Sequence, residues 1–147
     1  MARITQDTKI AALARAPLFR ELSKNELAQV ARLADDLEVP AGKVLTREGD
    51  FGHEFFVLVE GEVEFTRGGR RLQPDGPTEF FGEISLIERT RRMATVTTTT
   101  DARLFVLAER EFHTLLDENP KLERKVLLAL ARRLMALVEE EKHPTLA

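Results

Sequence analysis

One short stretch of the chain holds the residue types that bind an anion. It begins with Phe81-Gly82-Glu83-Ile84-Ser85-Leu86 and ends with Arg92-Met93-Ala94-Thr95-Val96, so nine positions separate the glutamate from the arginine. Backbone N–H groups and an arginine fork suit an anionic phosphate, and a nearby carboxylate can hold a sugar hydroxyl. We therefore predict that residues 81–96 bind a phosphate-containing ligand and that the other elements hold this stretch in place.

Length and composition are those of one soluble globular domain. The 147 residues are 43% hydrophobic and 32% charged, which suffices for a real core. The absence of cysteine excludes disulfides, thiolate metal sites and a cysteine nucleophile. No apolar run has the length of a membrane span or the form of a signal peptide, and the net charge of −3 gives no general attraction to nucleic acid. We expect a cytoplasmic protein.

Residues 1–37 have the pattern of helices. Ile10, Leu13 and Ala14 recur at helical spacing before Pro17 ends the segment. Ser23 and Glu26 then have the spacing of a capping box at the start of a second amphipathic helix. We interpret this region as a helical layer that packs on the rest of the domain.

Residues 38–108 carry strand and turn signals instead. The expected strands are short and recur at intervals of about eight to twelve residues, with glycine turns between them. They are Val44–Thr46, Phe55–Glu60, Val63–Thr66, Ala94–Thr99 and Arg103–Leu107, with a hairpin at 67–70. This pattern predicts an antiparallel β-roll or jelly roll, and with the flanking helices an α+β fold.

Residues 109–143 are predicted to form two C-terminal helices. Asn119-Pro120 has the N-cap and first-turn residues of the second, which we expect to end near Glu141. Its leucines 127, 130, 134 and 137 form a seam of about one and a half heptads. The seam fits packing on the chain's own roll or a homodimer through helix 119–141, and Val126 and Val138 widen the apolar surface.

The order of helices, β-roll and helices resembles the cyclic nucleotide-binding domain of the protein kinase A regulatory subunit and the bacterial catabolite activator protein. The phosphate-binding cassette of that family reads F-G-E-[hydrophobic]-[small]-L and then R-x-A-x-V, and residues 81–96 match it. Gly49-Asp50, Phe55–Val59, Gly61 and Ala131–Leu134 extend the resemblance over most of a single domain, 1–147.

The resemblance implies roles for single residues. Glu83 would accept a hydrogen bond from the ribose 2′-OH, and Arg92 would pair with the cyclic phosphate. The rest of the ligand-binding stretch is Phe81 at its start and the backbone around the phosphate and ribose, at Gly82, Ile84, Ser85, Met93 and Ala94. The resemblance implies no metal, no catalytic residue and no cofactor besides this ligand.

Two departures from the family pattern bear on the ligand. Met93 stands where relatives carry a Thr or Ser that hydrogen-bonds guanine, which favours cAMP over cGMP. Arg91 stands where many kinase-type cassettes have proline, so Arg91 or Arg89 is a competing anchor for the anion. In the last helix Leu134, Leu137 or Val138 would cap the base, and none of these side chains can hydrogen-bond it.

Enzyme chemistry finds no support in the sequence. His53, His113 and His143 lack the spacing of metal ligands, and Ser85 is not in a Gly-x-Ser-x-Gly elbow. Because only six residues follow Glu141, we expect no helix-turn-helix DNA-binding domain after this helix. We predict a cyclic nucleotide sensor that repositions its C-terminal helix toward an unknown effector. The alternative is a ligand-free member of the fold that acts as a dimerising protein-interaction module.

Overall fold

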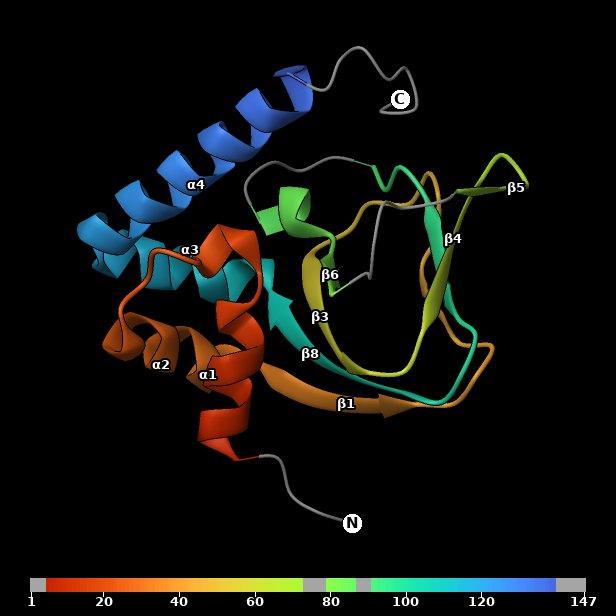
Figure 1. Ribbon diagram of the computed structural model, residues 1–147, viewed down its shortest axis with the longest axis horizontal. Helices are drawn as coiled ribbons and strands as arrows, with labels where there is room; N and C mark the ends of the chain where they lie inside the picture. The colour runs from red at the N-terminus through yellow and green to blue at the C-terminus, as the bar shows by residue number, and fades with distance from the viewer. Residues whose placement is uncertain (1–4, 73–78, 87–90, 140–147) are drawn as a thin grey trace.

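A computed structural model describes residues 5–72, 79–86 and 91–139, without the side chains of Ser85, Arg133, Leu134 and residues 136–139. The helices gather on one side of a β-roll (Figure 1). The helical elements are α1 (Gln6–Ala14), η1 (Pro17–Phe19), α2 (Lys24–Leu33), η2 (Glu83–Leu86), α3 (Glu109–Glu118) and α4 (Pro120–Glu139). The strands are β1 (Asp35–Val39), β2 (Val44–Thr46), β3 (Glu54–Glu60), β4 (Val63–Arg67), β5 (Arg70–Leu72), β6 (Phe80–Phe81), β7 (Thr95–Thr98) and β8 (Ala102–Ala108).

Two four-stranded sheets form the roll, and their orders are β1-β8-β3-β6 and β2-β7-β4-β5. All pairings among these strands are antiparallel. Side chains alternate between the two faces of β3, so Phe55 and Val57 enter the core beneath the helices while Phe56 and Leu58 enter the core of the roll. The predicted fold class, an antiparallel roll flanked by helices at both ends, is confirmed.

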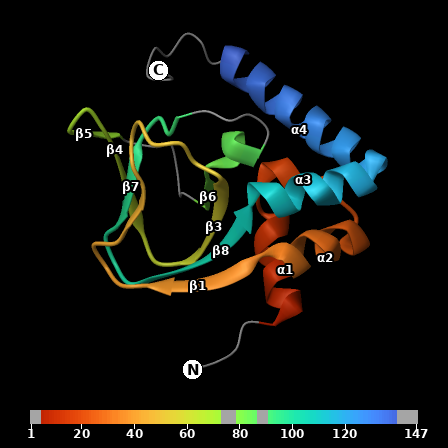
Figure 2. The same ribbon diagram turned by 180° about the vertical axis from the view of Figure 1, so that it is seen from behind.

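Phe19 joins the helical layer to the roll. Its ring contacts Phe55 of β3 edge-on at 5.7 Å between centroids and lies 5.9 Å from Phe112 of α3. All three rings are fully buried. The N-terminal helices, the roll and the C-terminal helices therefore share one core. Figure 2 shows from behind how α1, α2 and α3 gather beside the roll.

The capping box predicted at the start of α2 is confirmed. The Glu26 amide donates to Ser23 Oγ at 3.2 Å, and the Ser23 amide donates to Glu26 Oε1 at 2.8 Å. The helical layer nevertheless ends at Leu33, and β1 begins at Asp35, before the boundary that we set after residue 37. The sequence of β1 does not look like a strand because three of its five residues are acidic. Its pairing with β8 along its whole length, aided by Arg103 beside Asp36 and Glu38, decides its structure.

Helix α4 packs on the chain's own core and also exposes leucines. Leu122 and Val126 are fully buried among the helices, so Val126 does not widen an outer surface as the sequence suggested. Leu127 and Leu128 are 52% and 41% exposed. Of the predicted seam, Leu130 packs against the chain's own core while Leu127 faces outward, and the homodimer stays a prediction.

Two ion pairs make the stability of the fold fall as the solution becomes acidic. Hydrogen bonding to Lys125, 2.6 Å away, lowers the pKa of Glu26, and hydrogen bonding to Arg103 lowers the pKa of Asp36. A carboxylate with a lower pKa in the folded state stabilises the fold above its unfolded pKa, and this contribution is lost as pH falls through the folded pKa. We expect the free energy of unfolding, measured by urea titration, to fall between about pH 5 and pH 2.

The double variant Glu26→Gln, Asp36→Asn should be less stable at pH 7 and should lose less stability over that range. Glu111→Gln, which changes an exposed carboxylate of α3, is the matched control and should follow the native curve. A double variant with the native pH dependence would contradict the assignment.

Candidate phosphate-binding site

The cassette begins where β6 leaves the sheet. Phe81, the last residue of β6, stacks on Phe56 at 4.9 Å and meets Phe65 edge-on at 5.8 Å. It is buried in the core of the roll, so it fastens the cassette to the roll from inside. Gly82 follows with φ of +83°, a left-handed conformation that suits glycine, and turns the chain into the short helix η2.

Arg92 lies in a slot between two glycines. A Cβ atom at Gly52 would lie 1.8 Å from Arg92 Nε, and one at Gly82 would lie 2.7 Å from Arg92 Nη1. Arg92 Nη2 donates to the backbone carbonyl of Glu54 at 2.7 Å. The guanidinium therefore needs a residue without a Cβ atom on both sides, and the carbonyl of Glu54 at the start of β3 orients it.

The loop before β3 also holds the backbone of Arg92. The Arg92 amide donates to the Asp50 carbonyl at 2.7 Å, and the Gly49 amide donates to the Arg92 carbonyl at 2.9 Å. These bonds join Gly49 and Asp50 to the second half of the cassette across 43 and 42 positions of sequence. The sequence reasoning noted Gly49-Asp50 but missed Gly52 and the Glu54 carbonyl, because nothing in a single sequence tells a packing glycine from a turn glycine.

Arg92 is a partly desolvated cation beside carboxylates. Burial lowers the pKa of its guanidinium, and the charges of Glu54 and then Glu83 oppose that shift. The group stays protonated because arginine loses its proton only far above neutral pH. An anion that reached this guanidinium would meet a charge that water screens little.

Arg91 points to a different place from Arg92. Its guanidinium lies over the ring of Phe51 at 4.4 Å, and its Nη1 donates to the Gly49 carbonyl at 2.8 Å. The side chain is exposed. Arg92 is therefore the arginine inside the cassette, and Arg91 braces the loop from outside, while Arg89 lies outside the described residues.

The other predicted ligand-binding residues differ in exposure. Ile84 and Met93 are 51% and 55% exposed, so the cassette presents apolar side chains to its surroundings. Glu83 is half-buried at the first position of η2. The Ala94 carbonyl accepts a hydrogen bond from the Thr46 hydroxyl at 3.0 Å. The Ser85 side chain and the base-capping side chains of Leu134, Leu137 and Val138 lie outside the described set.

The far end of η2 is joined to α3. Leu86 is fully buried in the core that it shares with Phe112, and its carbonyl contacts Nε2 of His113. His53, just before β3, lies 3.1 Å from Glu109 at the start of α3. The two histidines thus bridge the roll and α3, a position that their spacing in the sequence did not reveal.

The described part of the chain holds no cluster of three or more His, Cys, Asp or Glu side chains arranged for a metal ion. None of its helices has the length and apolar character needed to cross a membrane.

Comparison with known proteins identifies the class. Residues 36–119, more than half of the chain, match the family described as cyclic nucleotide-binding domain. The chain belongs to that family.

Relatives of several kinds share the domain. A cyclic nucleotide-gated potassium channel from Rhizobium etli is 35% identical over 82% of this chain, which spans 34% of the channel. The N-terminal domain of a transcriptional regulator from Streptomyces coelicolor A3(2) superposes with a TM-score of 0.79 at 30% identity, over 88% of this chain and 94% of that one. The regulatory domain of Toxoplasma gondii PKA with cAMP superposes with a TM-score of 0.67 at 27% identity. The match covers 74% of this chain and 43% of that one.

The slot around Arg92 yields a test that needs no ligand. In Gly52→Ala the new methyl group should displace the guanidinium, and because this is the flexible end of a side chain, the fold should survive. We expect the Nε–H resonance of Arg92 to shift while the melting temperature changes little.

Gly42→Ala is the control. Gly42 has φ of +84° with open space around its Cβ position, so alanine there meets strain without a clash. It should cost roughly 1 kcal/mol of stability and leave the Arg92 resonance unmoved. An unshifted Arg92 signal in Gly52→Ala would refute the slot.

Proposed function

We propose that this chain binds a cyclic nucleotide at residues 81–96, that cAMP is preferred over cGMP, and that the chain acts as a sensor rather than an enzyme. The observation that carries the proposal is the slot of Arg92. It provides one oriented, half-buried guanidinium next to the glycine-led turn of η2.

The chemistry of the ligand matches this slot. A cyclic phosphodiester carries one negative charge and no terminal phosphate, so a single arginine with a few backbone amides can neutralise and orient it. Glu83 is close enough to Arg92 for its charge to raise the pKa of the guanidinium, and it begins η2. In this arrangement Glu83 accepts from the ribose 2′-OH while Arg92 pairs with the phosphate.

The preference for cAMP rests on Met93. Its side chain is 55% exposed in the cassette and offers no hydroxyl to the hydrogen-bonding edge of guanine. The related Toxoplasma gondii domain was crystallised with cAMP, which agrees with this choice. Base capping is assigned to α4, through Leu134, Leu137 or Val138.

A signal would leave the cassette through η2. Leu86 shares a core with Phe112 of α3 and Val126 of α4, and its carbonyl contacts His113. A ligand that shifts η2 therefore changes the packing of α3, and α3 carries α4 with it. The Lys125–Glu26 and Arg132–Glu21 ion pairs, which tie α4 to the N-terminal helical layer, would rearrange in that movement.

The outer side of α4 would receive the partner. Leu127, Leu128 and Met135 are 52%, 41% and 62% exposed, which fits a homodimer or a contact with an effector protein. This surface is also the observation that favours the second candidate function, a dimerising interaction module that needs no ligand.

Calorimetry with cAMP is the direct test. Arg92→Ala should weaken cAMP binding by about tenfold to a hundredfold, because a charge-assisted hydrogen bond contributes roughly 1.5–3 kcal/mol. Arg91→Ala removes the neighbouring, outward-facing arginine and should change affinity by less than about threefold.

No heat with cAMP or cGMP at high micromolar concentration would end the sensor proposal and leave the interaction module. Equal weakening by both arginine variants would show that the anchor has been assigned to the wrong side chain.

Base selectivity can be tested at one position. Met93→Thr supplies a hydroxyl where Met93 has none, so the ratio of cGMP to cAMP affinity should rise by about three- to tenfold. Met93→Val, which removes the sulfur without adding a hydroxyl, is the control. The same ratio in both variants would move base recognition away from Met93.

A further inference from the structure

His53 stands in the chain between the two groups that hold the Arg92 guanidinium. Gly52 precedes it and forms one wall of the slot. Glu54 follows it, and the Glu54 carbonyl accepts a hydrogen bond from Arg92 Nη2 at 2.7 Å. A shift of residue 53 would move this wall and this carbonyl with it, so whatever holds His53 also shapes the slot.

Helix α3 holds His53 by two contacts from a single residue. The Glu109 amide donates to the His53 carbonyl at 2.8 Å, and Glu109 Oε2 lies 3.1 Å from Nδ1 of the His53 ring. A carboxylate only accepts hydrogen bonds, so Nδ1 carries the proton in this contact. The backbone and the side chain of His53 therefore both meet a residue that lies 56 positions further along the chain.

The pairing of β3 with β8 brings the two residues together. Glu54, the first residue of β3, lies opposite Ala108, the last residue of β8. His53 and Glu109 come one position beyond this pair, where the strands end and α3 begins. The side chain of Glu109 is only 16% exposed. Water therefore competes less with this contact than it does with an ion pair on an open surface.

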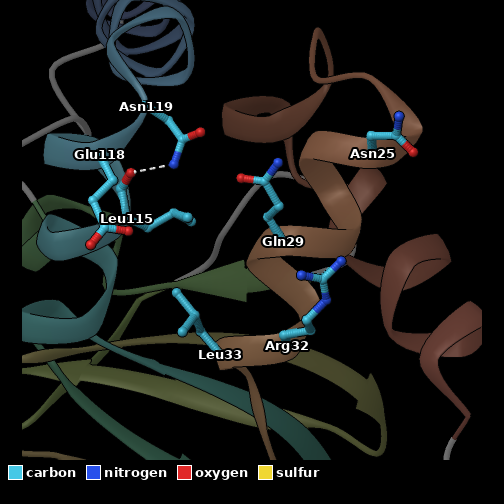
Figure 3. A pocket seen from close by; sticks show the side chains of 7 residues that line it. All are labelled: Asn25, Gln29, Arg32, Leu33, Leu115, Glu118 and Asn119. Atoms are coloured by element: carbon cyan, nitrogen blue, oxygen red, sulfur yellow. Dashed lines mark hydrogen bonds between the residues drawn. The ribbon is translucent and has the colours of Figure 1, made fainter.

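The start of α3 relies on His53 because it has no capping side chain of its own. Its N-cap residue is Ala108, which offers no side-chain acceptor to the free amides of the first turn, and the His53 carbonyl takes one of them. The other end of α3 is closed from within, since Asn119 Nδ2 donates to the Leu115 carbonyl at 2.8 Å (Figure 3). The loop before β3 thus anchors the start of this helix.

We propose that His53 and Glu109 form a clasp that positions the Arg92 guanidinium and couples it to the start of α3. His53 is a positioning residue, which acts on Arg92 through its chain neighbours Gly52 and Glu54. The use of that guanidinium for a cyclic phosphate rests on the proposed function, but the clasp itself belongs to the chain without ligand.

The clasp gives a bound anion a second route to the C-terminal helices. The first route passes through η2, whose Leu86 shares a core with Phe112 of α3. The second runs from Arg92 through the Glu54 carbonyl and His53 to Glu109. The two routes reach α3 about one turn apart. A ligand that engages both Arg92 and η2 therefore acts on this helix at two points.

The first test uses the chain without ligand and follows by NMR the exchange of the Arg92 Nε proton with water. His53→Ala and Glu109→Ala each open the clasp, so this exchange should become at least about threefold faster in both variants. His53→Asn places an amide N–H where Nδ1–H was and should restore the native rate. Glu111→Ala removes the other first-turn carboxylate of α3, which is exposed, and should also keep the native rate.

Native exchange rates in both the His53→Ala and the Glu109→Ala variants would overturn the proposal. A rate in His53→Asn equal to that in His53→Ala would overturn it too, because the hydrogen bond would then not be what holds the slot. Melting temperatures of the same samples show that each variant is folded at the temperature of the measurement.

The second test is a double-mutant cycle on cAMP affinity, measured by calorimetry. His53→Ala and Glu109→Ala should each weaken binding by about two- to tenfold, because the slot must then be ordered when the ligand binds. The double variant should bind no more weakly than the weaker single variant, since either change already opens the clasp. Additive losses would overturn the clasp as a unit. If the native chain binds no cyclic nucleotide, the proposed function fails, and the exchange of the Arg92 proton without ligand decides the clasp.

Discussion

The bare backbone on either side of the Arg92 guanidinium is the constraint on which the site depends. An arginine near the surface would ordinarily sample many rotamers, but here Gly52 and Gly82 form two walls and the Glu54 carbonyl orients the group. These three contacts come from the loop before β3, from the start of β3 and from the turn after β6. The strand order that pairs β3 with both β6 and β8 is what brings these segments to one place.

The helices complete this arrangement from the other side. Phe19 touches both β3 and α3, and Leu86 at the end of η2 is buried in the same core, so the cassette rests on the helical layer as well as on the roll. Phe81 belongs instead to the core inside the roll. The two ends of the segment 81–86 are thus held by different cores.

Much of this could be predicted from the sequence, because its signals are local. Capping at Ser23, the helix start at Pro120, the hairpin at 67–70 and the cassette motif all depend on neighbours within a few residues, and the fold class and family followed from them. The rest depends on contacts between distant segments. The acidic strand β1 exists because β8 pairs with it, and Gly52 matters because Arg92 lies 40 positions away. The pairing of His53 with Glu109 and of His113 with Leu86 is hidden for the same reason.

The single core beneath the helices has a consequence for the way the molecule opens. Leu86, Phe112 and Val126 belong to one buried cluster, so η2, α3 and α4 cannot lose their packing separately without exposing the same apolar surface. Slow amide exchange should therefore fall into a common class across these three segments, with β3 and β8 included through Phe55 and Phe105. A domain built in this way behaves as one cooperative unit, and free energy added anywhere along that cluster is shared by all of it.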